Sequence, residues 1–515
     1  MYIGCMSFLS PAEHRACIAF ARLVYGNPFL PERIEAERRI LGRAFVAEEP
    51  VWSLSSDFES SRPNVALLQE RGEALLATLR RRLEDMRLGS TELDLYVALG
   101  SYVLYYRCHE PLLSLAEAER GAAGDDPPRL PRSVWERFCE DYRSIFEVGG
   151  ASLCPHTPAH LLALCFQTRR AFVHVFNGLV GGSPSAAHLR AEVWHSIFTH
   201  DRQRYARSLY GRMRDLPTLI TGESGTGKEI VAGNIARSQY RPFDVKTAQF
   251  APPVEFAALN LSALPATLIE SELFGHKRGS FTGAGADRRG WLELVGVGGC
   301  VFLDEVGDVL PEVQVKLLRV LQDRTFQRVG DNRARRFEGK VIAATNRDLA
   351  ADMAGGRFRP DLYYRLSGDL VRTPSLREQI SGNEAELRRI LAIVTRRVVG
   401  NDTTTADALL DETLDCINTW IGPDYPWPGN FRELEQCVRN VLVRKRYDPP
   451  ERVANDASDL PAAVAAGTLS ADELLTRYVA HVHSRLGTYE AAARRLGIDR
   501  RTVKARVQAA RREEA

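Results

Sequence analysis

The sequence lacks an excess of charge of either sign, a long apolar run and any paired cysteine motif. Its 515 residues carry 68 basic and 66 acidic side chains, a net charge of +2, so whole-chain electrostatics predicts no class of partner. Nine cysteines are scattered without a CxxC pair, which argues against a disulfide scaffold or a zinc ribbon and favours reduced thiols. A composition of 44% hydrophobic and 26% charged residues is typical of a folded globular chain.

No segment is predicted to span a membrane or to direct secretion. The longest uncharged stretch, residues 148–168, contains two prolines and is typical of a loop that leads into a helix. The first fifteen residues show no basic region ahead of an apolar run, as a signal peptide would. We therefore expect a cytoplasmic protein without membrane contact.

The length predicts three or four domains. Residues 1–187 are expected to be mostly helical, because segments such as 65–87 and 158–179 carry apolar residues at near-helical spacing. A helix-like stretch, 186–214, leads into a different pattern. The remaining predicted parts are an α/β subdomain at 188–372, a helical subdomain at 373–447, a linker rich in alanine and proline at 448–469, and a small basic helical domain at 470–515.

Short apolar strands alternate with helices in the α/β part. The predicted strands are 218–220, 256–260, 300–304 and 340–345, and each ends in or next to a polar residue. This alternation predicts a doubly wound parallel sheet, in which ligands bind at the carboxyl ends of the strands.

A glycine-rich segment, GESGTGKE, follows the first strand. Its glycines allow a tight turn that points N–H groups at phosphate oxygens, and Lys228 adds a positive charge. The usual pattern has serine or threonine after the lysine, whereas this chain has glutamate. The segment predicts a nucleotide site, and a plain glycine-rich turn is the alternative. The predicted nucleotide-binding residues are Gly222, Glu223, Ser224, Gly225, Thr226, Gly227, Lys228 and Glu229.

Two carboxylates close the strand 300–304. Asp304 is suited to hold Mg²⁺ through water, and Glu305 to polarise the water that attacks a phosphoryl group. Alone, an Asp-Glu pair at a strand end would more simply cap a helix. Together with the glycine-rich segment, the pair favours an ATPase that uses ATP and Mg²⁺.

At this point the chain, from about residue 186 to 446, resembles the AAA+ domain of bacterial sigma-54-dependent transcription activators. The resemblance rests on seven ordered motifs, which include GESGTGKE, LNLSAL, ELFGHKRGSFTGA, RFRPDLYYRL and WPGNFREL. It implies an AAA+ fold, a parallel sheet with a helical lid, that binds ATP and assembles into a hexameric ring.

The resemblance also implies roles for single residues. Asn260 would restrain the catalytic Glu305 until nucleotide is in place, and Asn346 would be the first sensor. Arg432 would be the second sensor. Arg359 and Arg365 stand at the positions of arginine fingers, whose fixed planar charge stabilises the transferring phosphoryl group of a neighbouring subunit. A surface salt bridge is the alternative for each of these two arginines.

The most diagnostic motif implies a loop that contacts sigma-54. An apolar tip on a glycine-hinged loop suits a contact device better than a core element. Serine replaces the alanine usual at the second position. The loop residues are Gly279, Ser280, Phe281, Thr282, Gly283 and Ala284. The segment 238–255 is longer than usual and is predicted to be a surface insertion, and the entrance to the lid after Pro374 only partly resembles the family.

The C-terminal tail predicts a helix-turn-helix. A helix at 489–496, a turn at 497–499 with Gly497 and the N-cap candidate Asp499, and a second helix from residue 500 have the required spacing and resemble a Fis-type module. Residues 485–515 contain nine basic and four acidic side chains, so the positive charge is concentrated where DNA would bind. A solvated basic helix is the alternative. The DNA-binding candidates are Arg500, Arg501, Thr502, Lys504 and Arg506.

The N-terminal part, 1–187, shows no phosphoryl-receiver pattern and is expected to be a helical sensory domain that binds a ligand or a protein. Its cysteines and histidines have no metal-binding spacing, so structural roles are expected.

Three functions compete at this point. The first is an ATP-hydrolysing transcriptional activator that binds an upstream activating DNA sequence and remodels sigma-54 RNA polymerase to allow open-complex formation. The second is an AAA+ ATPase that remodels another protein client, with the tail as a DNA tether, and it leaves GSFTGA unexplained. The third is an anti-activator or sensor in which ATP binding matters but hydrolysis does not, and the presence of Asp304, Glu305 and both finger arginines counts against it.

Overall fold

The computed structural model describes residues 8–47, 63–83, 88–121, 129–282, 284–381, 383–400, 402–422, 425–449, 464 and 469–513. By its contacts the chain divides into two compact units, Met1–Arg446 and Tyr447–Ala515. Most of the predicted linker, 448–469, lies outside the described residues, as do the end of the predicted helix 65–87 and Gly283 of the predicted contact loop.

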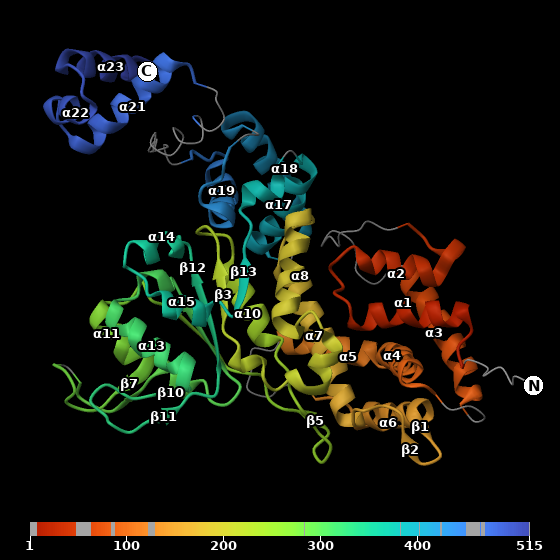
Figure 1. Cartoon of the computed structure of the whole chain (residues 1–515). Coiled ribbons are helices and arrows are strands. Elements are labelled where there is room, and N and C mark those ends of the chain that lie inside the picture. Colours follow the sequence, from red (N-terminus) through yellow and green to blue (C-terminus); the bar gives the residue numbers. More distant parts are fainter. Residues whose placement is uncertain are drawn as a thin grey trace, which may run out of the picture. The chain divides into compact units, whose positions relative to one another are not determined.

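The larger unit begins with a helical region (Figure 1). Its core is built mainly from aromatic and leucine side chains, and every long helix of the region contributes to it. The second helix contributes Leu41. The elements are α1 (Pro11–Tyr25), α2 (Glu32–Leu41), η1 (Gly42–Ala44), α3 (Pro63–Arg82), α4 (Ser90–Arg107), α5 (His109–Gly121), α6 (Arg132–Phe146), the hairpin β1 (Glu147–Val148) and β2 (Ala151–Ser152), and α7 (Pro158–Gly178).

A five-stranded parallel sheet follows. Its strand order is β13-β3-β12-β9-β6. Four of these strands were predicted, and the fifth was missed because its sequence, DLVR, is short and carries charges at both ends. The strands are β3 (Thr218–Thr221), β6 (Phe256–Asn260), β9 (Cys300–Asp304), β12 (Lys340–Thr345) and β13 (Asp369–Arg372).

Helices cover both faces of this sheet, as the doubly wound prediction requires. Successive strand residues alternate between two cores, so Leu219 and Leu303 face one helical layer while Ile220 and Phe302 face the other. The first layer contains α11 (Ala266–Phe274), α12 (Trp291–Leu294), α13 (Pro311–Asp323), α14 (Leu349–Ala354) and α15 (Pro360–Leu366). The second contains α7, α8 (Pro184–Phe198) and α10 (Lys228–Arg237) (Figure 1).

The helix-like stretch predicted at 186–214 is in fact several shorter elements. Helix α8 is capped by Ser183 and ends at Thr199, whose φ of 62° is incompatible with a continuing helix. Short turns follow at α9 (Arg202–Arg204), η2 (Tyr205–Leu209) and η3 (Met213–Asp215). The division drawn between residues 187 and 188 falls within α8.

The insertion 238–255 is not confined to the surface, contrary to the prediction. Its hairpin, β4 (Phe243–Asp244) and β5 (Gln249–Phe250), places Phe243 in the core of the helical region, against Trp135. Phe250 stacks on Phe166 with ring centroids 4.2 Å apart. Burial of the apolar area of these two rings favours packing of the insertion against the helical region over exposure to solvent. The insertion therefore connects the sheet to the helical region.

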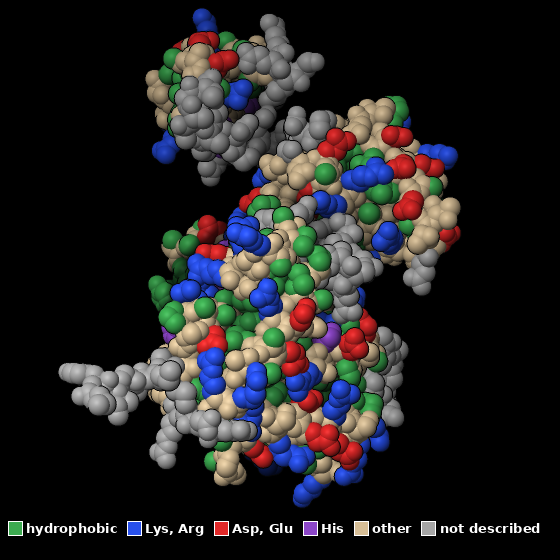
Figure 2. Space-filling model, turned by 90° about the vertical axis from the view of Figure 1, so that its right-hand side faces the viewer, with side chains coloured by type: hydrophobic (Ala, Val, Ile, Leu, Met, Phe, Trp, Pro, Cys, Tyr) green, Lys and Arg blue, Asp and Glu red, His purple; other side chains and the backbone are tan. Residues whose placement is uncertain are grey.

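The remaining helices of the larger unit form the lid: α16 (Leu376–Ile380), α17 (Glu384–Val399), α18 (Thr403–Cys416), η5 (Ile417–Ile421) and α19 (Asn430–Arg444). Short pieces complete the sheet region: β7 (Gly275–His276), β8 (Arg288–Arg289), η4 (Val306–Asp308), β10 (Thr325–Phe326) and β11 (Arg335–Arg336). Basic and acidic side chains are interspersed over the face of this unit seen in Figure 2.

The smaller unit contains α21 (Ala471–Leu486), α22 (Tyr489–Leu496) and α23 (Arg500–Glu513). The last two helices lie where the sequence predicted them. Within the described ranges, no helix is both long and apolar enough to cross a membrane.

Candidate active site

The glycine-rich segment forms a loop between β3 and α10, with positive φ angles at Gly222, Gly225 and Gly227. Gly225 is required here, because a Cβ would collide with the carbonyl oxygen of Gly429 in the lid. Thr226 donates to the Glu223 carbonyl and also lies 2.7 Å from the hydroxyl of Thr373. These contacts hold the loop in an open curve at the start of a helix, which is the geometry that binds phosphate.

Lys228 is the buried cation of this loop. Its Nζ donates to the carbonyls of Gly222 and Glu223 at 3.0 and 3.1 Å, and lies 4.0 Å from Oε1 of Glu305. Burial lowers the pKa of Lys228, and the nearby Glu305 and Asp304 oppose that shift. The amine therefore lies between the phosphate loop and the acidic pair. Glu229, one residue on, is exposed.

The acidic pair stands at the carboxyl end of β9. Asp304 accepts the backbone N–H of Glu305 at 3.1 Å. Glu305 has a φ of 56°, a strained conformation for a residue with a side chain, and its Oε2 accepts the backbone N–H of Asn346 at 3.2 Å. The turn thus aims Glu305 across the ends of β9 and β12. The fold thus brings together four residues that the sequence predicted to share a site: Lys228, Asp304, Glu305 and Asn346.

Asn260 ends the neighbouring strand β6, in register with Asp304. In this structure its Oδ1 accepts the N–H and hydroxyl of Ser262 and the N–H of Ala263, at 2.8 to 3.2 Å. The side chain closes its own turn, and the hydrogen bond found for Glu305 comes from Asn346.

The lid reaches the phosphate loop through residues that sequence reasoning missed. Asn430, fully buried with a φ of 52°, donates to Oε2 of Glu223 and to the carbonyl of Ser224, both at 3.0 Å, and accepts from the N–H of Leu376 at 2.7 Å. Its place in the WPGNFREL motif was a usable clue. The predicted sensor Arg432 lies beside it and donates to the Ser224 hydroxyl at 3.2 Å.

The predicted finger residues lie on α15, away from these contacts. Arg359, exposed at its N-terminus, pairs with Asp361 at 2.7 Å. Arg365 is exposed, and within the described ranges it makes no hydrogen bond or ion pair. Neither arginine contacts the phosphate loop of its own chain, so neither completes the site in cis.

The predicted contact loop joins β7 to β8. The N–H of Gly279, φ 79°, bonds to the Ala284 carbonyl at 2.9 Å, and Phe281 packs edge-on against His276 with ring centroids 5.0 Å apart. Phe281 remains 37% exposed, and Ser280 and Thr282 flank it. The loop is therefore a braced turn that presents an aromatic residue.

In the smaller unit, helices α21, α22 and α23 share a core of Val479, Val482, Ala492, Val503 and Val507. Gly497 adopts φ 67° between α22 and α23, and Asp499 accepts the Arg501 N–H at 2.7 Å. Arg506 pairs with Asp472 of α21 at 2.5 Å, and Arg500 with Glu490 at 2.8 Å. Arg501, Thr502 and Lys504 are exposed on α23.

Three cysteines of the helical region, Cys108, Cys154 and Cys165, are buried. Burial lowers the pKa of His156 to about 4 and that of His174 to about 3, so both rings are neutral at pH 7.

Comparison with known proteins adds to this geometry. A family model described as Sigma-54 interaction domain matches residues 200–371. The Nif-specific regulatory protein of Azotobacter vinelandii is 38% identical over 303 residues, 56% of this chain and 53% of that protein. The transcriptional regulatory protein ZraR of Salmonella typhimurium is 37% identical over 345 residues, 64% of this chain and 68% of that protein. The chain spans about half the length of the first of these relatives.

Among solved structures, NtrX from Brucella abortus in complex with ATP is 24% identical, and the match covers 69% of this chain and 76% of that chain. The TM-score of that match is 0.38. The matched domain and the relatives are consistent with the parallel sheet, the phosphate loop and the acidic pair found in this chain. The chain belongs to the family of sigma-54-dependent transcription activators, built on an AAA+ nucleotide-binding fold.

Proposed function

We propose that this protein is an ATP-hydrolysing activator that binds an upstream DNA site and remodels sigma-54 RNA polymerase to allow open-complex formation. The observation that carries the proposal is that one α/β subdomain contains three parts. These are the phosphate loop with Lys228, the acidic pair at the end of β9, and the predicted contact loop, which is closed by the hydrogen bond from Gly279 to Ala284. An activator with these partners and this substrate would act in the cytoplasm.

Hydrolysis is proposed to use Glu305 as general base. The carboxylate is held at the mouth of the phosphate loop by the Asn346 N–H and lies near Lys228, where it can accept a proton from the water that attacks the γ-phosphate. Lys228 would exchange its two backbone carbonyl partners for phosphate oxygens. Asn260 would turn from its own loop toward Glu305 when the nucleotide state changes.

The donor set fits magnesium. One Asp304 oxygen accepts a backbone N–H, and the side chain is only partly buried at the strand end, where a hydrated cation can reach it. Asp304 would hold the ion through water, and the ion would neutralise charge on the phosphates.

A ring, a hexamer by family resemblance, would complete each site. Arg359 and Arg365 project from the outer surface of α15 and do not reach the phosphate loop of their own chain, which suits them to act on a neighbouring subunit. The exposed pair between Arg359 and Asp361 is weak enough to break at a subunit interface.

The exposed face of α23 is the proposed DNA surface. Arg501, Thr502 and Lys504 are free to contact a groove, with Arg500 at the helix start, whereas Arg506 is committed to Asp472 and stabilises the three-helix fold. Arg501→Ala combined with Lys504→Ala should weaken binding at all salt concentrations and reduce the salt slope by about one per lost phosphate contact. ATPase activity of the same variant serves as the control, and unchanged DNA binding would move the surface elsewhere.

The contact loop provides the decisive experiment. Phe281→Ala and Thr282→Ala should retain ATP hydrolysis and ring assembly yet lose open-complex formation at a sigma-54 promoter. Neither side chain offers an acid, a base or a charge for phosphoryl transfer, while Phe281 offers exposed apolar area to a partner. Val297→Ala, an exposed apolar residue outside the loop, is the matched control. Full activation by both loop variants would favour an AAA+ ATPase acting on another client.

We also propose that the helical region up to about residue 187 is the regulatory domain. Its support is position: α7 packs directly against α10, the helix that begins at Lys228.

A further inference from the structure

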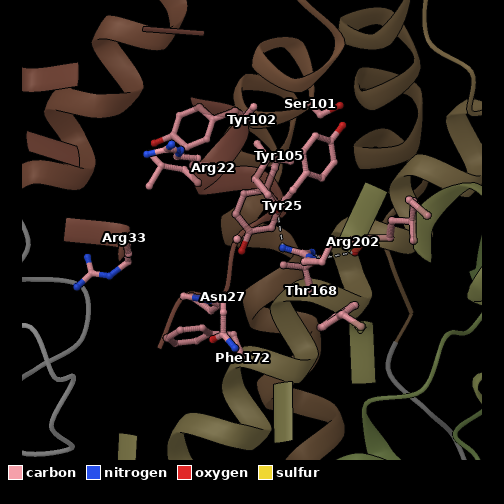
Figure 3. Close-up of a pocket in the computed structure, with 18 of the residues that line it drawn as sticks. Arg22, Tyr25, Asn27, Arg33, Ser101, Tyr102, Tyr105, Thr168, Phe172 and Arg202 are labelled. Atoms are coloured by element: carbon pink, nitrogen blue, oxygen red, sulfur yellow. Dashed lines mark hydrogen bonds between the residues drawn. The ribbon is translucent and has the colours of Figure 1, made fainter. Parts of the chain in front are cut away.

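A cavity of about 820 Å³ lies where the helical region meets the ATPase. One side is formed by helices α1, α2, α3, α4 and α7, and the other by α8, α9 and η2. Figure 3 shows Tyr25, Tyr105, Thr168 and Arg202 converging in this space. This volume is large enough for a small organic molecule.

Most of the cavity wall is apolar or aromatic. Leu68, Leu164, Phe172, Trp194 and Phe198 contribute hydrocarbon surface. Hydroxyl groups interrupt it at a few points, among them Ser101, Thr168, Tyr25 of α1 and three tyrosines of α4. A lining of this kind selects an apolar body and orients it through a small number of polar contacts.

Arg202 is a charged group of this wall, and no acidic residue of the described ranges pairs with it. Its guanidinium donates to the carbonyl of Val24 at 2.6 Å and to the hydroxyl of Thr168 at 2.7 Å. It also lies over the rings of Phe198 and Trp194, 4.6 and 5.2 Å from their centroids. Two neutral oxygens and two aromatic faces position the cation without neutralising it.

The charge inventory of the whole lining points the same way. It contains four arginines against two glutamates, and one of those glutamates, Glu37, is already engaged by Arg33 at 2.5 Å. Burial keeps the pKa of His156 on this wall near 4, so the ring adds no charge at neutral pH. A net positive, largely apolar cavity is suited to an organic anion.

We propose that this cavity is a binding site for a small, largely apolar organic anion, an aromatic or aliphatic carboxylate or its equivalent, whose anionic group pairs with Arg202.

The position of the site links occupancy to the ATPase. Trp194 and Phe198 on α8 share a core with Val231 and Ala232 of α10, the helix that starts at Lys228. Across the cavity, the Asn27 side chain donates to the Ala191 carbonyl of α8 at 2.9 Å. A ligand that contacts both walls would stabilise one arrangement of α1 and α8 relative to each other.

The test uses the full chain and two fluorescent probes that differ in charge. The anionic probe is 1-anilinonaphthalene-8-sulfonate, and the neutral one is N-phenyl-1-naphthylamine. Arg202→Gln should weaken binding of the anionic dye about tenfold to a hundredfold, the range for a lost charged hydrogen bond, and change the neutral dye less than about twofold. Arg204→Gln, an exposed arginine two residues away, is the matched control and should change neither.

Ser101→Phe, which fills the cavity from α4, should weaken binding of both dyes. Unchanged anionic-dye affinity in Arg202→Gln, or equal losses of both dyes, overturns the proposal, as does normal binding in Ser101→Phe. If Arg202→Gln does not fold, the proposal is tested by the affinities of the two dyes for the wild-type protein and for Ser101→Phe. The anionic dye must bind at least about tenfold tighter than the neutral one, and Ser101→Phe must abolish that binding.

Discussion

At the scale of single residues, the site is held by hydrogen bonds that a bound nucleotide would replace. Lys228 is 7% exposed and rests on two backbone carbonyls, and Glu305 is held in a strained turn by a single N–H. Both side chains are therefore poised by the main chain around them rather than by each other, which leaves them available to phosphate and water.

Replacement of the loop lysine should abolish nucleotide binding. In Lys228→Ala the phosphates lose their buried cation, and the carbonyls of Gly222 and Glu223 lose their donor. Titration with a fluorescent ATP analogue measures the effect. Lys246→Ala, an exposed lysine on the 238–255 hairpin, serves as the control. Wild-type affinity in Lys228→Ala would disprove the site assignment.

Glu305→Gln separates binding from hydrolysis. The amide keeps the shape of the side chain and loses the base, so ATP affinity and ring assembly should persist while turnover falls about 10²–10⁴-fold. Steady-state phosphate release, with sedimentation of the ATP-bound protein as the assembly check, provides the measurement. Turnover near that of the parent would mean that the proton goes to another group.

At the scale of elements, the lid contacts the phosphate loop through the start of α19. Asn430 sits at the start of this helix and bonds both to the loop and to the first turn of α16. Glu433 supports the same corner by accepting the Gly429 N–H at 2.7 Å. One buried amide thus joins the lid to the nucleotide site.

Asn430 variants should reveal how much of this junction is hydrogen bonding and how much is backbone conformation. Asn430→Gly removes the three side-chain bonds and tolerates φ 52°, while Asn430→Ala also adds strain at a positive φ. We expect both to destabilise the lid by about 1–3 kcal/mol, with alanine the worse by about 1 kcal/mol. Hydrogen exchange of the α19 amides reports the change, and equal exchange in the parent and both variants would contradict it.

At the scale of the whole larger unit, the helical region and the ATPase are joined through cores as well as through the chain. Helix α7 contributes to the core behind the sheet, and the 238–255 hairpin contributes to the core of the helical region. The buried pair between Arg241 and Glu119, at 2.8 Å, fixes the same junction. Packed side chains therefore connect the two parts without a break.

The hairpin should matter for stability in a way that a surface insertion would not. Phe243→Ala removes a buried ring packed on Trp135 and Phe250 and should destabilise the helical region by about 3–5 kcal/mol. Limited proteolysis and thermal melting of the full chain detect the loss. Val245→Ala, at the exposed tip of the same hairpin, is the control, and identical behaviour of the two variants would argue that the contact contributes nothing.

The sequence alone determined four of the five strands, the phosphate loop, the acidic pair and the last two tail helices, because each depends on local pattern: alternation of apolar residues, glycines at fixed spacing, and polar residues at strand ends. Conversely, no local pattern shows that Asn430 donates to Glu223 across 207 positions, or that Phe243 packs against Trp135 in the core of the helical region.

Only the tertiary structure decided those contacts, along with the fifth strand, the pairing of Arg506 with Asp472 while Arg501 stays exposed, and the cavity around Arg202. Each of these depends on which surfaces meet after the helices and strands have formed. Burial and pairing between distant segments leave no period in the sequence, and the chain must fold before they can be seen.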